Sequence, residues 1–315
     1  MRVLVVTNMF PTPREPWFGS FVADQVDDLR ALGLDMTVLH FDGRQNRLNY
    51  LRAMRNVRST VAREEVDLIH AHYGLSGAVA LMQFRVPVVT TLHGSDYTGA
   101  VPWHSYVSWL VVRRSTPIFV SAEGAERLRC PWGSVITVGV DTKLFTPRDR
   151  AEARDALGWP VDGIYVLLPG SRRAPGKRAD LFDAAVWEAQ RRAPDLKGVS
   201  LEGFSRQEAA LVMNAIDVTL MTSDREGSPV AIKESLACMT PVVSVRVGDV
   251  PDLIAGLPGC AIASRDPAAL AEAVLASLDT GRRAELRQRA ERFSRPRVAE
   301  RVSALYNGVA GGNGA

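Results

Sequence analysis

Two carboxylates flank a predicted helix start late in the chain. After a strand-like segment, Ser228 and Pro229 are a typical N-cap and first helical residue. The N–H groups of that first turn have no partner within the helix, and the helix dipole behind them favours a phosphate. Glu226 and Glu234 would repel a phosphate unless they bind something else, and ionised carboxylates accept short hydrogen bonds from sugar hydroxyls. We therefore expect a phosphorylated sugar here; the alternative is that both carboxylates and Lys233 serve only the surface and the helix.

A second loop of anion-binding character follows the predicted strand Ile164–Leu168. It resembles a P-loop, but five residues instead of four separate Gly170 from Gly176, and an arginine stands where Ser or Thr would hold magnesium. A nucleoside triphosphatase is therefore excluded. Arginine offers a fork and lysine a point charge, which together suit a diphosphate, although a solvated basic loop is the alternative. The cations in question are Arg172, Arg173, Lys177 and Arg178.

Other glycines and histidines follow the predicted strands of the first half. The first strand lacks a G-x-G-x-x-G sequence after it, which disfavours a dinucleotide oxidoreductase. Gly19 begins the first long helix, where a bare backbone can approach a phosphate closely. His93 ends a strand, where it can donate to a sugar hydroxyl or transfer a proton. His70 and His72 end another strand but lack a nearby Cys or carboxylate cluster, so no metal site is expected.

The elements that position these residues alternate between β-branched and amphipathic segments. This alternation is typical of parallel sheets wound with helices, and we expect strands in two successive sets. Ligands of such sheets bind outside the carboxyl ends of the strands, and two adjacent domains imply a cleft between them. The predicted strands are Val3–Val6, Met36–His40, Val66–Ala71, Val86–Leu92, Ile118–Ser121 and Val135–Val138, then Ile164–Leu168, Val199–Glu202, Val218–Thr222, Pro241–Val245 and Ala261–Ala263.

Composition limits the classes of protein. The 315 residues suggest about two domains at roughly 150 residues each. A hydrophobic share of 46% with 23% charged residues excludes general disorder. The net charge of +3 is too small to make nucleic acid the expected partner. Three cysteines do not form a disulfide framework, and no membrane span or signal peptide is recognisable, so a cytoplasmic location is expected.

Other hydrolytic sites are disfavoured by missing motifs. The chain has neither the G-x-S-x-G elbow nor the H-E-x-x-H zinc motif. A glycosidase would need two carboxylates across the scissile bond, and Glu226 with Glu234 could be imagined in that role. The basic loop would then have no purpose.

Taken together, these motifs resemble the donor site of retaining nucleotide-sugar glycosyltransferases of family 4. The resemblance rests on Glu226-Gly227-Ser228-Pro229, on Glu234 with seven residues between it and Glu226, and on the strand from Pro241. It covers essentially the whole chain and implies the GT-B fold, with two facing Rossmann-like domains. Weaker matches are the connector Thr137–Asp141 with Phe145 and Pro147, the histidine His93, the glycine Gly19, and the turn Val247–Pro251. The implied domains are residues 1–145 on the acceptor side, 146–295 on the donor side, and a C-terminal segment 296–315 that crosses back.

The resemblance also implies roles for individual residues. Glu226 would contact hydroxyls of the transferred sugar, and Glu234 the ribose of the nucleotide. Lys177 would clamp the diphosphate together with an arginine, and irregular spacing leaves Arg172 and Arg173 as alternatives. His93 would touch the donor sugar. Backbone groups along the donor would come from Gly227, Ser228, Pro229 and Val230, with Gly19 on the opposite side.

The co-substrate implied is a nucleoside diphosphate sugar of UDP or GDP type, with no cofactor and no metal. The departing phosphate itself would help to deprotonate the acceptor on the same face, giving retention. Relatives often carry an extra strand where Leu196 here runs almost directly into the next strand, so the chain is a compact variant. A same-fold nucleotide-sugar epimerase and a catalytically inactive binding protein remain the alternatives.

The acceptor is expected to be a carbohydrate, a lipid-linked molecule or a small molecule with a hydroxyl group. Arginines cluster at residues 44–63, and they suit either a solvated helix face or a peripheral contact with the inner face of a membrane. Aromatic residues at helical spacing suit either a stacking surface or the core. These are Trp103, His104, Tyr106 and Trp109.

Overall fold

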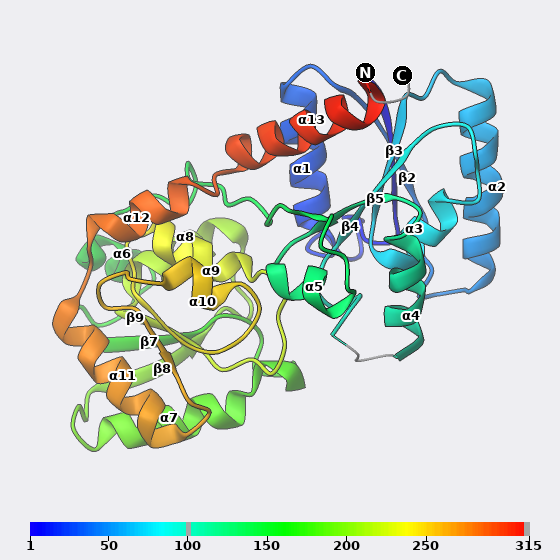
Figure 1. The fold of residues 1–315 in the computed structure, drawn as a ribbon. Coiled ribbons are helices and arrows are strands. Elements are labelled where there is room, and N and C mark those ends of the chain that lie inside the picture. The colour runs from blue at the N-terminus through cyan, green and yellow to red at the C-terminus, as the bar shows by residue number, and fades with distance from the viewer. Residues whose placement is uncertain (99–101, 312–315) are drawn as a thin grey trace. The chain divides into compact units, whose positions relative to one another are not determined.

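The computed structural model describes residues 1–98 and 102–311, and they form two compact units (Figure 1). Unit 1 comprises Met1–Gly139 and the segment from Arg295 onward, and unit 2 comprises Val140–Ser294. The boundary therefore lies six residues before the expected division at 145/146. The reason is that Val140 pairs with Ser294 and Phe145 is buried in the core of unit 2.

Unit 1 is built on a six-stranded parallel sheet of order β2-β1-β3-β4-β5-β6. The neighbours of β1 are β2 on one side and β3 on the other, so the chain changes direction across the sheet at β1. A change of this kind creates a crevice at the carboxyl ends of the strands. The strands are β1 (Arg2–Thr7), β2 (Asp35–His40), β3 (Leu68–His72), β4 (Val88–Leu92), β5 (Thr116–Phe119) and β6 (Ser134–Val135).

Helices cover both faces of this sheet. Alternate residues of β1 point to opposite faces: Val3 and Val5 pack with α1 and α13, and Leu4 and Val6 with α2 and α3. The C-terminal helix α13 lies along α1, where Arg295 forms ion pairs with Asp24 and Asp28. The helices of unit 1 are α1 (Ser20–Ala31), α2 (Leu48–Arg63), α3 (Gly74–Ala80), α4 (Pro102–Val111), α5 (Ala122–Arg127) and α13 (Arg295–Gly311).

Unit 2 is built on a five-stranded parallel sheet of order β11-β10-β9-β7-β8. Its change of direction falls between β7 and β9. The strands are β7 (Ile164–Leu168), β8 (Leu196–Ser200), β9 (Val218–Met221), β10 (Val242–Val245) and β11 (Ala261–Ala263). The eleven expected strands are thus all present, although β8 begins three residues before its expected start.

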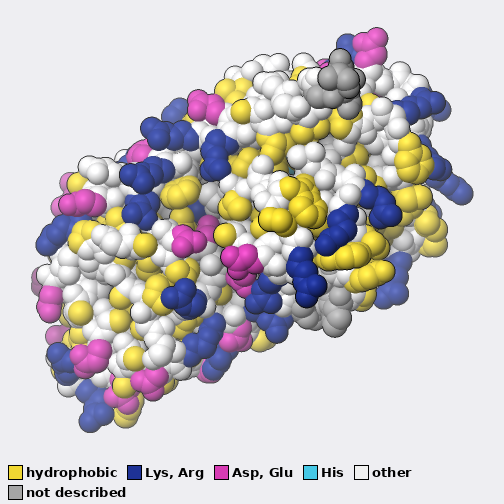
Figure 2. All heavy atoms as spheres, viewed as in Figure 1, with side chains coloured by type: hydrophobic (Ala, Val, Ile, Leu, Met, Phe, Trp, Pro, Cys, Tyr) yellow, Lys and Arg dark blue, Asp and Glu magenta, His cyan; other side chains and the backbone are white. Residues whose placement is uncertain are grey.

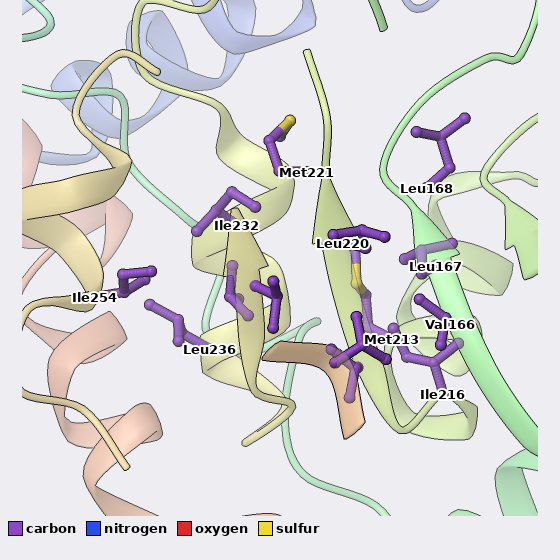
Figure 3. Packing of buried hydrophobic residues seen from close by; sticks show 14 of the residues in the cluster. Val166, Leu167, Leu168, Met213, Ile216, Leu220, Met221, Ile232, Leu236 and Ile254 are labelled. Carbon is purple, nitrogen blue, oxygen red and sulfur yellow. The ribbon is translucent and has the colours of Figure 1, made fainter. Parts of the chain in front are cut away.

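The core of unit 2 lies between this sheet and the surrounding helices. Figure 3 shows Leu167 and Leu220 from neighbouring strands beside Ile232 and Leu236 of α9. The helices are α6 (Arg150–Ala156), η1 (Pro175–Lys177), α7 (Ala179–Gln190), α8 (Arg206–Ala215), α9 (Val230–Ala237), α10 (Val250–Ile254), α11 (Pro267–Thr280) and α12 (Ala284–Glu291). Among the helices that the structure describes, none combines the length and apolarity needed to cross a bilayer.

Candidate functional site

Two loops of unit 2 meet at the carboxyl ends of the adjacent strands β7 and β9. The basic loop follows β7 and contributes Lys177, and the second loop follows β9 and contributes Glu226. The Lys177 Nζ and Glu226 Oε1 atoms are 2.7 Å apart. The side chains keep 26% and 17% of their surface exposed, so the pair is accessible from solvent yet well fixed. The structure therefore unites the principal cation and carboxylate that the sequence singled out.

Backbone hydrogen bonds tie the two loops together. The Thr222 hydroxyl donates to the Lys177 carbonyl at 2.9 Å, and the Asp224 N–H donates to the Gly176 carbonyl at 2.9 Å. Arg265, which follows β11, donates to the carbonyls of Thr222 and Ser223 from the other side. These hydrogen bonds fix the backbone around Lys177, which is a precondition for placing its ammonium group accurately.

Gly170 makes room for the Lys177 side chain. Its φ is +150°, and a Cβ added to it would lie 2.8 Å from Cε of Lys177. Any larger residue would push the ammonium group away from its present position. The sequence signals this glycine only as part of an imperfect P-loop pattern.

A buried lysine organises the turn before α9. Lys233 has no exposed surface, and its Nζ atom lies 2.5 Å from the Ser228 hydroxyl and 3.7 Å from the Asp249 carboxylate. Ser228 donates in turn to Asp249 at 2.6 Å. The expectation that Ser228 caps the helix is therefore wrong: Pro229 occupies the N-cap position, because the hydroxyl is held by Lys233 and Asp249. The alternative that Lys233 serves only the surface is also wrong, because its side chain is fully buried.

The turn after β10 supports the same loop. Gly248 has a φ of +52°, and a Cβ added to it would lie 2.6 Å from the Gly227 carbonyl oxygen and 3.0 Å from that of Glu226. The Asp249 N–H donates to the Gly227 carbonyl at 3.2 Å. The turn after β10 therefore holds the peptide that follows Glu226 in place, and position 248 of this turn accommodates glycine far more easily than a larger residue.

The remaining predicted residues of unit 2 surround this centre. Arg172 pairs with Asp183, and Arg173 pairs with Glu202 at 3.0 Å. Both arginines thus have carboxylate partners, and the choice between them as a diphosphate ligand stays open. Glu234 is buried within α9. The expected contact of Glu234 with a ribose stays a prediction.

Unit 1 carries His93 in a row of stacked imidazoles. His93 Nε2 lies 3.1 Å from His72 Nδ1, and the two rings stack with centroids 5.3 Å apart. His70 continues the row and lies between the Thr91 hydroxyl, at 2.7 Å, and the Tyr306 hydroxyl of α13. Burial lowers the pKa of His70 to about 3, and it lowers the pKa values of His72 and His93 as well. Neutral imidazoles can each donate once and accept once, as this chain of contacts requires.

Asp96 fixes the strand ends on which this row stands. Its carboxylate accepts from the Gly74 N–H at 2.7 Å and from the His93 N–H at 2.6 Å, so one side chain joins the loops after β3 and β4. Burial raises its pKa to about 7, while these hydrogen bonds act in the opposite direction. No motif in the sequence signals Asp96, because both of its partners are backbone groups.

Gly19 has a structural reason to be glycine. It is the N-cap of α1 with a φ of 74°, and a Cβ there would lie 2.4 Å from the Met9 carbonyl carbon. The close approach is thus to the chain's own backbone. A further contact of Gly19 with a donor stays a prediction.

An apolar cavity of about 610 Å³ opens at the carboxyl ends of β1 and β3. Asn8 and Tyr73, the residues that follow these strands, lie in its wall, which is the crevice position expected for this sheet. Trp103 and His104 also line it, so these two aromatic residues of α4 belong to a cavity instead of the core. Other lining side chains are Met9, Phe18, Arg44, Arg47, Tyr50, Met54, Leu75, Val79 and Val107.

Acid should weaken unit 1 through the imidazole row. The pKa of His70 is about 3 in the folded chain, against about 6.5 when unfolded. The unfolded state therefore binds more protons between these values, and the free energy of unfolding falls as the pH is lowered through that range. We expect His70 alone to contribute a loss of about 2 kcal/mol between pH 7 and pH 5.

The measurement is urea unfolding at pH 7 and pH 5 of the wild type and of His70→Gln. The loss on acidification should be about 2 kcal/mol smaller in the variant, and the opposite effect of Asp96 cancels because both proteins contain it. His40→Gln at the end of β2 is the comparison: burial lowers the pKa of His40 too, so a smaller change in the same direction is expected there. An identical acid loss in wild type and His70→Gln would contradict the buried neutral imidazole.

Within residues 1–98 and 102–311, no group of three or more His, Cys, Asp or Glu side chains gathers as a metal site would require. The expected lack of a metal stays a prediction until metal dependence is measured.

Comparisons with known proteins agree with this arrangement. Residues 2–144 match the model of Glycosyltransferase Family 4, and residues 176–280 match that of Glycosyl transferases group 1. A D-inositol 3-phosphate glycosyltransferase of Acidothermus cellulolyticus is 29% identical, over 70% of this chain and 61% of its own length. The chain thus spans about three fifths of that relative. The putative teichuronic acid biosynthesis glycosyltransferase TuaC of Bacillus subtilis is 25% identical, over 87% of this chain and 88% of its own.

Solved structures show the same fold. Sucrose-phosphate synthase of Thermosynechococcus elongatus has a TM-score of 0.80 at 19% identity and covers 99% of both chains. Anabaena HepE in complex with UDP-glucose has a TM-score of 0.71 at 18% identity, covering 98% of this chain and all of its own. With two parallel-sheet units and strand-end loops that carry Lys177 and Glu226, the chain has the GT-B fold and combines a Glycosyltransferase Family 4 domain in its first half with a Glycosyl transferases group 1 domain in its second.

Proposed function

We propose that the chain transfers a sugar from a nucleoside diphosphate sugar to a hydroxyl group of an acceptor, with retention of anomeric configuration. The observation that carries this proposal is the accessible Lys177–Glu226 pair at the carboxyl ends of β7 and β9. A cation for a leaving diphosphate and a carboxylate for sugar hydroxyls stand side by side, and each satisfies the other while no donor is bound.

Donor binding would separate the pair. The Lys177 ammonium turns to the diphosphate, and Glu226 accepts hydrogen bonds from hydroxyls of the transferred sugar. Both new contacts are charge-assisted, so they replace one strong interaction by two. The N–H groups at the start of α9 add donors for the phosphate. The turn that holds them needs no rearrangement, because Lys233 and Asp249 already fix it.

In the transfer step, the bond between the anomeric carbon and the diphosphate oxygen breaks, and its electron pair stays on the diphosphate. The acceptor oxygen bonds to the anomeric carbon on the same face, and its proton passes to the departing phosphate oxygen. Lys177 stabilises the growing negative charge of the diphosphate, a task of preorganised electrostatics. His93 lies at the end of β4 and is neutral, which suits a hydrogen bond to the donor sugar.

The acceptor is proposed to enter the cavity of unit 1. Its volume of about 610 Å³ lies within the usual range for small-molecule sites, and it is placed at the crevice of the sheet. Trp103 offers an aromatic face and Tyr50 a hydroxyl, a combination that sugars and apolar groups both fit.

A thermal-shift panel with UDP-, GDP-, dTDP- and ADP-sugars, each with and without EDTA, tests the donor class. A ligand at about a hundred times its Kd adds about 2.7 kcal/mol, which corresponds to an increase in Tm of about 5–10 °C for a chain of this size. We expect this increase with a UDP- or GDP-sugar and no change with EDTA. Loss of the shift in EDTA would contradict a metal-free clamp, and no shift with any member of the panel would contradict the donor assignment.

A further inference from the structure

The helix α2 has an unusual distribution of charge. Between Gly43 and Arg63 the chain has six arginines and no acidic residue. Ala53, Val57 and Val61 form the buried side of α2. The arginines are exposed, at positions 44, 47, 52, 55, 58 and 63. A whole segment of the surface is therefore cationic, although the chain has a net charge of only +3.

Five of these six arginines have no carboxylate partner among the described residues, whereas Arg44 pairs with Glu15. The five are Arg47, Arg52, Arg55, Arg58 and Arg63. Arg52 reaches only the Asn49 side chain, at 3.4 Å, and Arg58 donates to the Met82 carbonyl at 2.7 Å. By contrast, Arg30 of α1 and Arg127 of α5 each pair with an aspartate or glutamate of their own helix. The charge of α2 is thus left for something outside the chain.

Apolar side chains stand among these cations on the outer side of α2. Leu48 and Leu51 each have 56% of their surface exposed. They lie at helical spacing with Arg52 and Arg55, so all four share one face. Figure 2 shows dark blue and yellow side chains intermixed on the right, where α2 lies. An exposed face that mixes leucine with arginine is typical of helices that lie in a membrane interface.

The loop after α3 continues this face. Arg58 binds the carbonyl of Met82, so the loop lies against α2. Two residues further on, Phe84 is 86% exposed. An aromatic ring in solvent at a loop tip has no packing role in unit 1. We call the set Leu48, Leu51, Arg52, Arg55 and Phe84 the α2 docking face.

We infer that the α2 docking face binds the surface of an anionic lipid bilayer. The arginines complement acidic headgroups, each contributing on the order of 1 kcal/mol near such a surface, and the apolar side chains enter the boundary of the acyl chains. A nucleic acid fits the charge and could stack a base on Phe84, but it leaves the exposed side chains of Leu48 and Leu51 without a partner. A bilayer satisfies both parts of the face at once.

The inner side of the same helix lines the apolar cavity. Arg47, Tyr50 and Met54 of the α2 region belong to its wall. Arg44 and Arg47 belong both to this wall and to the exposed cationic segment, so docking would place the edge of the cavity beside the lipid interface, and the acceptor would be a lipid-linked molecule presented from the bilayer. This last step rests on the proposed function, whereas docking itself does not.

Flotation with vesicles tests the docking face without any donor or acceptor. The full chain is mixed with vesicles of phosphatidylcholine alone or with 30% phosphatidylglycerol (about one lipid in three), at low and high salt. We expect flotation only with the anionic vesicles and release at high salt. Arg52→Glu/Arg55→Glu should weaken binding at least about tenfold, because two charges are reversed. Leu48→Ser/Leu51→Ser and Phe84→Ser should weaken it at unchanged net charge.

The matched control is Arg292→Glu/Arg297→Glu, which changes the net charge equally with exposed arginines elsewhere. If this control loses flotation as much as Arg52→Glu/Arg55→Glu, overall charge explains binding and the docking face is wrong. Binding to RNA but not to vesicles would overturn the inference in favour of a nucleic acid. Every variant should keep the nucleotide-sugar thermal shift, so a failed docking face and a failed donor site give different results.

Discussion

Lys177→Ala lowers kcat/KM for sugar transfer by about a hundredfold to a thousandfold, the loss typical when one preorganised group that stabilises developing negative charge is removed. The fold should persist, because the side chain is partly exposed and its main chain is held by Thr222 and Asp224. Most of the loss should appear in kcat, since charge on the diphosphate grows towards the transition state. Initial rates with saturating donor, compared with Lys143→Ala on an exposed loop, measure it.

Variants of Glu226 distinguish the contribution of the ion pair to stability from the contribution of each side chain to catalysis. If Lys177 and Glu226 only stabilise each other, removing both should restore what either single variant loses. If each contacts the donor, Lys177→Met/Glu226→Leu should be at least as inactive as the worse single variant. Recovery of activity in the double variant would contradict the proposed roles. A drop in Tm equal in all three variants would point to a structural pair.

This pair is also the part of the site that the sequence predicts best. Lys177 and Glu226 each follow a recognisable buried strand, and the carboxyl ends of parallel strands share one edge of a sheet. The strand order places β7 beside β9, so the two loops become neighbours. Local signals together with the general rule for doubly wound sheets are sufficient for this result.

The supports of the site depend on long-range partners and are not visible in local sequence. Lys233 has the sequence context of a surface charge, and its burial beside Asp249, sixteen residues later, depends on the tertiary fold. The Ser228 cap was wrong for the same reason, since a tertiary hydrogen bond competes with the local one. In unit 1, His70 and His72 share one face of β3, but Tyr306 reaches the row from the C-terminal helix. No spacing rule connects residues so distant.

Asp249→Ala should destabilise unit 2 by about 3–5 kcal/mol, because it removes a carboxylate that lies 3.7 Å from the buried Lys233 ammonium. The change is measured by urea unfolding, with Asp252→Ala on the exposed side of α10 as the control. The reciprocal variant Lys233→Met/Asp249→Leu removes both charges and should recover most of the loss, since well-packed apolar residues often replace a buried pair without penalty.

The pH dependence of the free energy of unfolding shows whether the buried charge of Lys233 causes the loss of stability in Asp249→Ala. Burial lowers the pKa of Lys233 from its ordinary value near 10.4, while Asp249 raises it, so the variant without Asp249 has the lower pKa. Between the folded and unfolded values the unfolded state binds more protons, and the free energy of unfolding rises with pH. Asp249→Ala should therefore recover stability towards pH 10 more steeply than the wild type. A loss below about 1 kcal/mol, or a loss independent of pH, would show that Lys233 finds another partner and that the turn before α9 does not depend on this pair.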